Sequence, residues 1–386
     1  MKKIIKSYKY RIYPIKHQEI LFAKHFGSNR FVYNYFLNER KKRYLKDKTN
    51  FGYNDNSKEL TLLKKENNYD WLKEINSQSL QSTLRHLDFA YKNFFMKRSK
   101  FPKFKSKSNK QSFKIPQHTT IKNKMLYFPK FNEGIKINLP QEIEGRIITT
   151  TISKSPTGKY YASITCEVDY KPYKKTGSKV GIDTGIKNLA ILSDGDIYEN
   201  IRVLKNKIKK LKYKSKQLSK KKKGSNSRDK YIKELSILYE KITNIRKDYL
   251  HKVTTEIVKN HDTISVEDLA VKNIMKNHKL AQAMSDVSLG IFYTFLEYKC
   301  EWNEKEYVKI DRWFPSSKTC SKCGWIKQDL TLKDRKWKCD SCGEEHDRDI
   351  NAAKNILTQG INILSGCGLQ SDKKQKEVEA LSLDKS

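Results

Sequence analysis

Apolar residues recur at helical spacing between about Lys16 and Lys100. One set follows at intervals of four, three, four and three, which places its members on a single helix face: Leu80, Leu84, Leu87, Tyr91 and Phe94. A similar face upstream contains Phe31, Val32, Tyr35 and Phe36. Gly27 predicts a turn before that face, and the polar stretch Thr49–Asn56 predicts a loop. We interpret these aromatic residues as the core of a helical domain rather than as a base-stacking surface.

The pattern changes to short β-like runs between about Phe101 and Tyr170. Arg146–Ser153 and Tyr160–Val168 flank the turn signal Ser155–Gly158, which predicts a β-hairpin. The strand Ile4–Ile12 is expected to join this region, and Cys166 is expected to be a buried spectator. We therefore predict a small β domain, arranged as a barrel.

The second half of the chain alternates strands and helices after a predicted linker at Lys171–Lys179. Val180–Leu192 has two apolar runs around a glycine-containing turn. Two long helical patterns follow and predict an antiparallel helical hairpin; they are marked by Leu204, Ile208, Leu211 and Leu218, then by Leu235, Leu238, Ile242, Ile245 and Tyr249. The remaining expected elements are a strand in His261–Ala270, a helix at Tyr293–Trp302, a strand at Tyr307–Ile310 and a disordered tail after Leu364.

The charge of the chain points to a polyanionic partner. The 386 residues include 80 Lys and Arg but 43 Asp and Glu, so the formal net charge is +37. This excess favours nucleic acid as the partner. Between residues 201 and 223 there are twelve Lys and Arg and no acid. A solvated charged face is the ordinary explanation for such a run, but we favour a surface that follows a nucleic-acid backbone, because unbalanced repulsion costs helix stability.

Composition and length exclude several classes of protein. The length allows two or three domains, and 37% of residues are apolar, so the chain can build a core. No run approaches the roughly 18 apolar residues of a membrane span, and the basic start of the chain lacks the apolar stretch of a secretory signal. Seven cysteines, an odd number with four in two CxxC pairs, suit a reducing compartment and a metal site.

The two CxxC pairs predict a structural zinc site. Cys320 and Cys323 form the first pair, Cys339 and Cys342 form the second, and fifteen residues separate the pairs. Each pair places two thiolates on one tight turn, and the two turns together complete a tetrahedron around one Zn²⁺. Trp325 and Trp337 would then form the small core of the ribbon, and Lys318, Lys322 and Lys327 would offset the negative charge of the thiolates.

Three acidic residues stand at the ends of apolar segments. Asp183 ends the strand pattern after Gly181, Glu267 closes Ile264–Val266, and Asp349 lies just before a predicted helix. Each alone has an ordinary explanation, as a solvated strand end or as a helix N-cap. If the three converge, they would repel one another unless cations bridged them. Two Mg²⁺ ions about 4 Å apart would then be suited to phosphodiester hydrolysis.

These motifs together resemble the TnpB (OrfB) family of insertion-sequence transposons, the smaller relatives of type V CRISPR effectors. The resemblance is carried by Gly181–Asp183, Glu267–Leu269, the four-cysteine ribbon and Asp347–Ala353. It extends along nearly the whole chain, through Tyr8–Pro14, Phe101–Lys105 and Ser316–Cys320.

The resemblance implies an α/β multidomain protein with an RNase H-like (RuvC) nuclease domain. It implies that Asp183, Glu267 and Asp349 are the catalytic residues and hold two Mg²⁺, with Asp347 and Asp268 nearby. The implied domains are a β-barrel wedge domain (1–16 and 101–176), a helical recognition domain (17–100), the RuvC domain (177–315 and 347–366), a zinc ribbon that binds target nucleic acid (316–346) and a disordered tail (367–386).

The implied activity is RNA-guided cleavage of DNA by two-metal-ion hydrolysis. The implied partners are a transposon-encoded guide RNA (omega RNA) and double-stranded target DNA with a short adjacent motif, read partly by base pairing with the guide. A monomer in the prokaryotic cytoplasm, associated with the nucleoid and without membrane contact, is expected.

Three alternatives remain open. A DDE-type transposase usually has its acids in the order Asp, Asp, Glu, whereas the order here is Asp, Glu, Asp. A nuclease-dead, guide-directed DNA-binding repressor should have lost at least one carboxylate. A plain zinc-ribbon DNA-binding protein gives the three acids no task.

Overall fold

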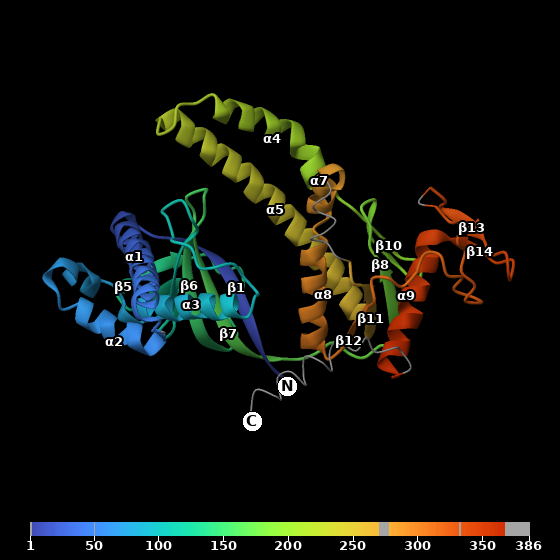
Figure 1. The fold of residues 1–386 in the computed structure, drawn as a ribbon, viewed down its shortest axis with the longest axis horizontal. Helices are drawn as coiled ribbons and strands as arrows, with labels where there is room; N and C mark the ends of the chain where they lie inside the picture. The colour runs from blue at the N-terminus through green and yellow to red at the C-terminus, as the bar shows by residue number, and fades with distance from the viewer. Residues whose placement is uncertain (1, 50, 270–277, 332, 367–386) are drawn as a thin grey trace. The chain divides into compact units, whose positions relative to one another are not determined.

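The computed structural model describes residues 2–49, 51–269, 278–331 and 333–366 (Figure 1). The chain divides into two compact units, Met1–Tyr170 and Lys171–Ser386, called unit 1 and unit 2 below.

The helices of unit 1 pack around an apolar core. They are α1 (Lys16–Asp47), α2 (Tyr53–Leu63), the 3₁₀ helix η1 (Asn67–Glu74) and α3 (Ser77–Phe95). Leu80, Leu84 and Leu87 are fully buried, so the predicted stripe on α3 is confirmed. The turn predicted at Gly27 is wrong, because α1 continues through it. Phe22 and Phe36 are buried on either side, and their packing outweighs the roughly 1 kcal/mol that a helical glycine costs.

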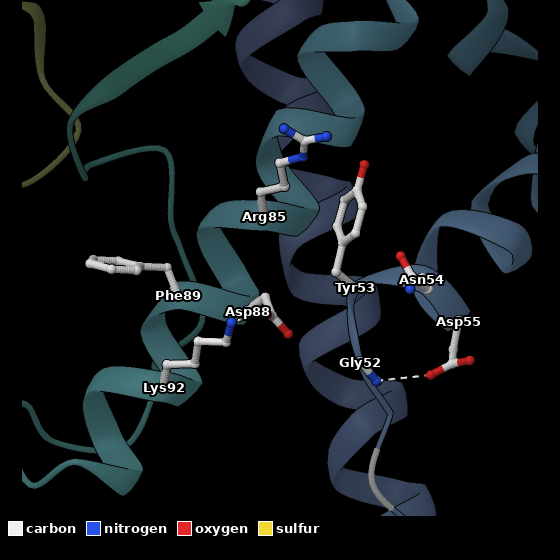
Figure 2. A pocket seen from close by; sticks show the side chains of 8 residues that line it. All are labelled: Gly52, Tyr53, Asn54, Asp55, Arg85, Asp88, Phe89 and Lys92. Atoms are coloured by element: carbon white, nitrogen blue, oxygen red, sulfur yellow. Dashed lines mark hydrogen bonds and ion pairs between the residues drawn. The ribbon is translucent and has the colours of Figure 1, made fainter. Parts of the chain in front are cut away.

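Helix α2 begins inside the segment that the sequence predicted as a loop. Gly52 precedes its first residue, and the carboxylate of Asp55 accepts a hydrogen bond from the Gly52 N–H at 3.0 Å (Figure 2). A carboxylate that satisfies a free N–H at a helix start stabilises that start. The polar composition of Thr49–Asn56 therefore reflects a helix start as well as a loop.

The sheet of unit 1 has seven strands in the order β2-β6-β7-β1-β5-β4-β3. The strands are β1 (Lys2–Tyr13), β2 (Gln111–Ile115), β3 (Thr120–Lys122), β4 (Met125–Phe128), β5 (Phe131–Ile137), β6 (Arg146–Lys154) and β7 (Tyr160–Tyr170). The predicted hairpin is confirmed as β6 and β7, and β1 pairs with β7 from Lys2↔Tyr170 to Ile12↔Tyr160. Cys166 is buried, as expected. Among the described residues no pairing joins the end strands β2 and β3, so closure into a barrel stays a prediction.

Unit 2 contains a five-stranded mixed sheet in the order β10-β9-β8-β11-β12. The strands are β8 (Lys179–Asp183), β9 (Asn188–Leu192), β10 (Ile197–Glu199), β11 (Thr263–Glu267) and β12 (Glu306–Ile310). Strands β8, β11 and β12 are parallel, and β9 runs antiparallel to β8. The two apolar runs of Val180–Leu192 therefore form the predicted pair of strands. Parallel strands buried on both faces explain the nearly continuous apolar runs in this half of the sequence.

Helices α4 (Val203–Ser219) and α5 (Asn226–Asn260) lie side by side and form the predicted hairpin (Figure 1). Helix α5 extends beyond the predicted pattern to Asn260, because Leu250, Val253 and Ile257 continue into the buried core beneath the sheet. The other helices are α7 (His278–Val287), α8 (Leu289–Asn303) and α9 (Arg348–Leu364). The predicted tail after residue 366 lies outside the described residues. No helix in the described part of the chain is long and apolar enough to cross a bilayer.

Helix α9 contacts the sheet at two glycines. A Cβ atom on Gly181 of β8 would lie 2.0 Å from the Ala353 carbonyl oxygen of α9. A Cβ on Gly360 of α9 would lie 1.9 Å from the Ser265 hydroxyl of β11. Neither position has room for a side chain, so the absence of one allows the helix backbone to rest directly on β8 and β11. This contact fixes the height of α9 above the two strands.

Candidate functional site

The three predicted carboxylates line one cavity in unit 2. Asp183, Glu267 and Asp349 share a cavity of about 360 Å³. The rest of its lining is Phe314, Pro315, Ser316, Ser317, Lys318, Arg348 and Ala352. The residues come from four separate stretches of chain, so the cavity exists only in the folded unit.

The topology of the unit 2 sheet explains why the three carboxylates line one cavity. Strands β8 and β11 are parallel neighbours with Ile182 opposite Val266, so Asp183 and Glu267 follow at the same edge of the sheet. Asp349 lies in the first turn of α9, which packs against both strands. The carboxyl ends of parallel strands are where open α/β sheets place ligands.

The electrostatics of the cavity favour a bound cation. Burial, then Asp349 and Glu267, raise the pKa of Asp183 to about 7, while Arg348 and the Thr184 N–H act in the opposite direction. Burial and the neighbouring Asp268 also raise the pKa of Glu267. A carboxylate in such surroundings is protonated or compensated by positive charge. Carboxylate oxygens are the donors that Mg²⁺ prefers, so the chemistry of these side chains suits a divalent metal ion.

The neighbouring acids have partners of their own. Asp347 is the N-cap of α9 and accepts hydrogen bonds from the N–H groups of Asp349 and Ile350. The capping role considered for Asp349 therefore belongs to Asp347. Asp349 is free of that role and accepts a hydrogen bond from Arg335 at 3.3 Å. Asp268 forms an ion pair with Arg312.

One buried contact beside the site was missed by the sequence interpretation. The hydroxyl groups of Thr184 and Tyr293 share a hydrogen bond of 2.6 Å. Thr184 follows Asp183 directly, and Tyr293 lies on α8. Tyr293 is far away in sequence and fits a helical apolar pattern, so no local signal marks it. The bond links α8 to the end of β8.

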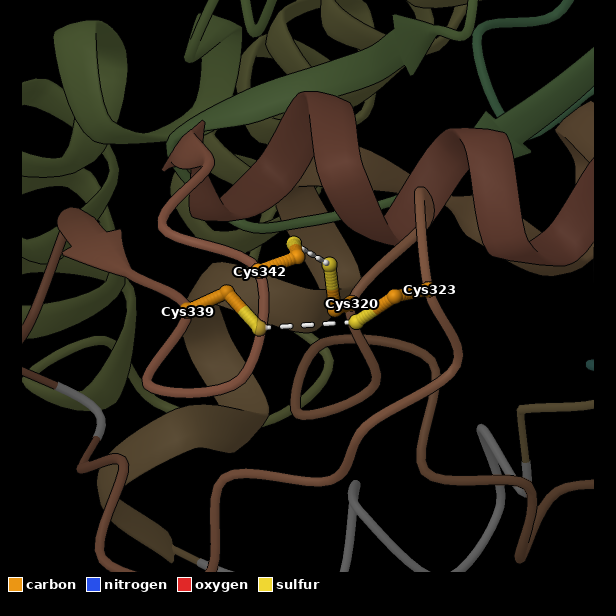
Figure 3. Close-up of side chains that lie close together, drawn as sticks. All are labelled: Cys320, Cys323, Cys339 and Cys342. Atoms are coloured by element: carbon orange, nitrogen blue, oxygen red, sulfur yellow. Dashed lines mark hydrogen bonds between the residues drawn. The ribbon is translucent and has the colours of Figure 1, made fainter.

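The four cysteines form a compact cluster (Figure 3), and their donor atoms all lie within 4.8 Å of one another. The Sγ atoms of Cys320 and Cys342 are 3.7 Å apart, and those of Cys323 and Cys339 are 3.6 Å apart. Zn–S bonds of about 2.3 Å in a tetrahedron give S···S separations of about 3.8 Å. The cluster therefore fits the predicted zinc site.

The ribbon around the cysteines contains the short antiparallel strands β13 (Lys336–Lys338) and β14 (Glu345–Asp347). Trp337 is buried and Trp325 packs partly buried against the same cluster, in agreement with a miniature core. The lysines predicted to offset the thiolates have other partners. Lys322 forms an ion pair with Glu344, and Lys327 forms one with Asp340, because each of these carboxylates lies within contact distance and carries a full negative charge. Lys318 donates to the Gln328 carbonyl.

Unit 1 contains a second cavity, of about 650 Å³, between α2 and α3 (Figure 2). The Arg85 guanidinium lies over the Tyr53 ring at 5.0 Å from its centroid. Phe89 and Lys92, one and two helical turns further along α3, also line the cavity, and the Phe89 side chain is exposed. Cationic and aromatic groups on one surface are suited to the phosphates and bases of a nucleic acid.

The basic run predicted from residues 201–223 forms α4 and the turn after it. Lys214 pairs with Glu234 of α5. Among the described residues, Lys214 is the lysine of α4 for which an ion pair is found. The other lysines leave α4 with a large excess of positive charge, which favours a polyanion-binding surface.

Family models match three parts of the chain. A model described as "Probable transposase" matches residues 163–278, one described as "Cas12f1-like, TNB domain" matches 290–356, and one described as "Helix-turn-helix domain" matches 1–49. In the described part of that last range the chain forms the strand β1 and the single long helix α1, which is a different arrangement from a helix-turn-helix.

Curated relatives cover nearly the whole chain. A protein of Streptomyces pristinaespiralis named "Putative RNA-guided DNA endonuclease" is 39% identical and spans 95% of this chain and 92% of its own length. The InsQ protein of Escherichia coli, with the same description, is 32% identical and spans 97% of each chain. These matches define a transposon-associated class of nucleases. The chain belongs to the TnpB (OrfB) family.

A solved Cas12f1–sgRNA–target DNA complex aligns with 92% of this chain and 99% of the Cas12f1 chain. The sequence identity is 17% and the TM-score is 0.35, too low to bear on the fold.

Proposed function

We propose that this protein is an RNA-guided DNA endonuclease that hydrolyses phosphodiester bonds with divalent metal ions. One observation carries the proposal: in a member of the TnpB family, Asp183, Glu267 and Asp349 line a single cavity at the carboxyl ends of β8 and β11. The names of the full-length relatives support the same activity.

The three carboxylates would hold two Mg²⁺ ions. Divalent ions at such a site activate water and stabilise the leaving oxygen. Lys318 and Arg348 line the same cavity, where their positive charge attracts a phosphate chain to the carboxylates. Asp347 caps α9 and so keeps Asp349 in its first turn, directed at the cavity.

We assign the partners and domains as follows. The partners are a transposon-encoded guide RNA and double-stranded DNA with an adjacent motif, and the protein acts as a monomer in the cytoplasm at the nucleoid. The sheet of unit 2 with α9 is the RNase H-like (RuvC) domain, residues 316–346 are a zinc ribbon, and unit 1 combines the wedge and recognition domains. The α4 surface and the Tyr53–Arg85 cavity supply contacts to nucleic acid.

The alternatives fit less well. A nuclease-dead repressor has no use for three intact carboxylates in one cavity. A DDE-type transposase would have a different order of acids along the chain. A plain zinc-ribbon protein leaves the cavity without a task.

The test replaces Asp183 with Asn, which keeps the shape of the side chain and removes its charge. Loss of a metal-binding carboxylate removes several kcal/mol of transition-state stabilisation, so cleavage of target DNA should fall at least about 100-fold. RNA-dependent DNA binding, measured by gel shift, should persist. The control is Asp248→Asn on α5, which alters an exposed acid paired with Lys252 and should leave cleavage intact. Unchanged cutting by D183N would refute the assignment.

A further inference from the structure

Two asparagines of α9 lie between the carboxylate cavity and the ribbon. Asn351 and Asn355 are one helical turn apart and follow Asp349 on the same helix. The two residues are 1% and 5% exposed. A buried amide needs hydrogen-bond partners, so the partners of these two side chains indicate the structural role of each.

Both amides bond to the backbone of the segment that leads into the ribbon. The Asn351 Nδ2 donates to the Thr319 carbonyl at 2.7 Å, and its Oδ1 accepts from the Ser321 N–H at 2.9 Å. The Asn355 Nδ2 donates to the Ser316 carbonyl at 2.8 Å and to the Thr319 carbonyl at 2.6 Å. The bonded groups lie on both sides of Cys320, the first cysteine of the predicted zinc site.

This segment is also a wall of the cavity. Ser316 and Lys318 line it together with Asp349. The segment has little regular structure of its own, so its place depends on what it is bonded to. The asparagine bonds tie it to the helix that carries Asp349. Only a side chain with both a donor and an acceptor can satisfy a carbonyl and an N–H as Asn351 does.

We propose that Asn351, supported by Asn355, is a positioning residue for the carboxylate site. Its amide holds the Ser316–Lys318 wall at a fixed separation from Asp349 and so sets the width of the cavity for metal ions and phosphate. The cysteine cluster braces the same segment from its other side through Cys320. This inference rests on the proposed function.

The test measures metal binding without relying on cleavage. Mn²⁺ prefers oxygen ligands, so it reports on the carboxylates of the zinc-loaded, full-length protein. We expect Asn351→Ala to weaken Mn²⁺ binding, measured by titration calorimetry, by about tenfold, the lower end of the effect of losing a supporting contact around a metal site. The Mg²⁺ concentration that half-saturates cleavage should rise by a similar factor. One zinc per chain should remain.

Two further variants make the test specific. Asn362→Ala changes an exposed asparagine on the same helix and should alter neither value. Asn355→Ala leaves both Asn351 bonds in place and should shift both values in the same direction as N351A, and it carries the test if N351A does not fold.

Two results would overturn the inference: metal affinity in N351A and N355A equal to that in N362A, with only the melting temperature lowered, or loss of zinc from N351A, which would make Asn351 a residue of ribbon folding. The proposed function fails separately, if D183N binds Mn²⁺ as tightly as the unaltered protein.

Discussion

Asp183 and Lys299 show how burial acts on opposite charges in unit 2. Burial raises the pKa of the acid and lowers that of the base, since it disfavours the charged form of each. Asp183 faces two further carboxylates, and a cation would relieve their repulsion. Lys299 instead donates three hydrogen bonds of 2.7 Å, to the His251 carbonyl and to the hydroxyls of Thr254 and Thr255.

Lys299 predicts a specific dependence of stability on pH. Burial lowers the pKa of Lys299 to about 8, below its usual value of 10.5. Between these two values the unfolded chain binds more protons than the folded one at this residue, so its contribution to the free energy of unfolding rises with pH. We expect Lys299→Met, which keeps the apolar stem, to remove this contribution to the increase in unfolding free energy with pH. Urea unfolding of both proteins at pH 7.5 and 9.5 measures it.

The difference between the two proteins isolates Lys299 from every other group that titrates in this range. If the unfolding free energies of wild type and K299M change in parallel between the two pH values, the lowered pKa is wrong.

At the scale of elements, the contact of α9 with the sheet is a close fit that one methyl group disturbs. Gly360→Ala places a Cβ against the Ser265 hydroxyl and should destabilise unit 2 by about 1–3 kcal/mol. Ser265→Gly in the same chain removes the obstructing atoms and should restore part of the loss. Thermal unfolding of the single and double variants measures both effects.

Gly290→Ala is the matched control, because nothing lies within 4 Å of a Cβ at that position in α8. It should be neutral or slightly stabilising. A double variant no more stable than G360A would show that Ser265 is not the obstacle.

The ribbon is expected to depend on its metal. Purified protein should contain one zinc per chain by mass spectrometry, and chelation should disorder residues from about 315 to 346, because a site of four thiolates contributes much of the folding energy of a small ribbon. Trp337 would lose its burial, so its fluorescence should change. Asp183, Glu267 and Asp349 lie outside the ribbon, so chelation of zinc should not directly remove these carboxylates from the cavity.

Cys166→Ala serves as the control, since this buried cysteine lies in β7 of unit 1 and should not affect zinc content. A protein without zinc, or a ribbon whose NMR spectrum survives chelation, would contradict the prediction.

The elements that were predicted from the sequence are those with a strong local period. The stripe on α3, the β6–β7 hairpin and the α4–α5 hairpin each carry their own pattern, and each is confirmed. The prediction that was wrong concerns a residue whose conformation depends on tertiary packing. Gly27 is a helix breaker by propensity, yet tertiary packing carries α1 through it. Helix α5 runs on to Asn260, because Leu250, Val253 and Ile257 continue its apolar face into the core beneath the sheet.

The candidate site shows the same division. Asp183 and Glu267 were singled out because each ends an apolar segment, and Asp349 because it precedes a predicted helix. The spacing of the cysteines was sufficient to predict the ribbon. Tyr293 and Asn351 contact parts of the chain that are distant in sequence, so only the folded structure reveals that they lie beside the site. Which of Asp347 and Asp349 caps the helix also followed only from hydrogen bonds.

For the whole molecule, the net charge of +37 predicts binding that weakens steeply with salt. Changing Lys220, Lys221, Lys222 and Lys223 to Gln should flatten the plot of log affinity for guide RNA against log salt concentration. The expected change is roughly 0.7–0.9 per lysine that contacts a phosphate. Fluorescence anisotropy over a salt series measures the slope.

Lys214→Gln is the matched control, because Lys214 is already paired with Glu234 and should change the slope less. The same slope in the fourfold variant and in the unaltered protein would show that the turn after α4 does not contact the RNA backbone.

The pairing of β1 with β7 has a consequence for engineering. Because Lys2 stands opposite Tyr170, the first described residue of unit 1 and its last residue are neighbours on adjacent strands. A short linker could join them, and new termini could be opened at Gly158, an exposed residue of the β6–β7 turn, without removing a strand. Unit 1 is therefore suited to circular permutation, which would allow a cargo domain to be attached at a chosen loop.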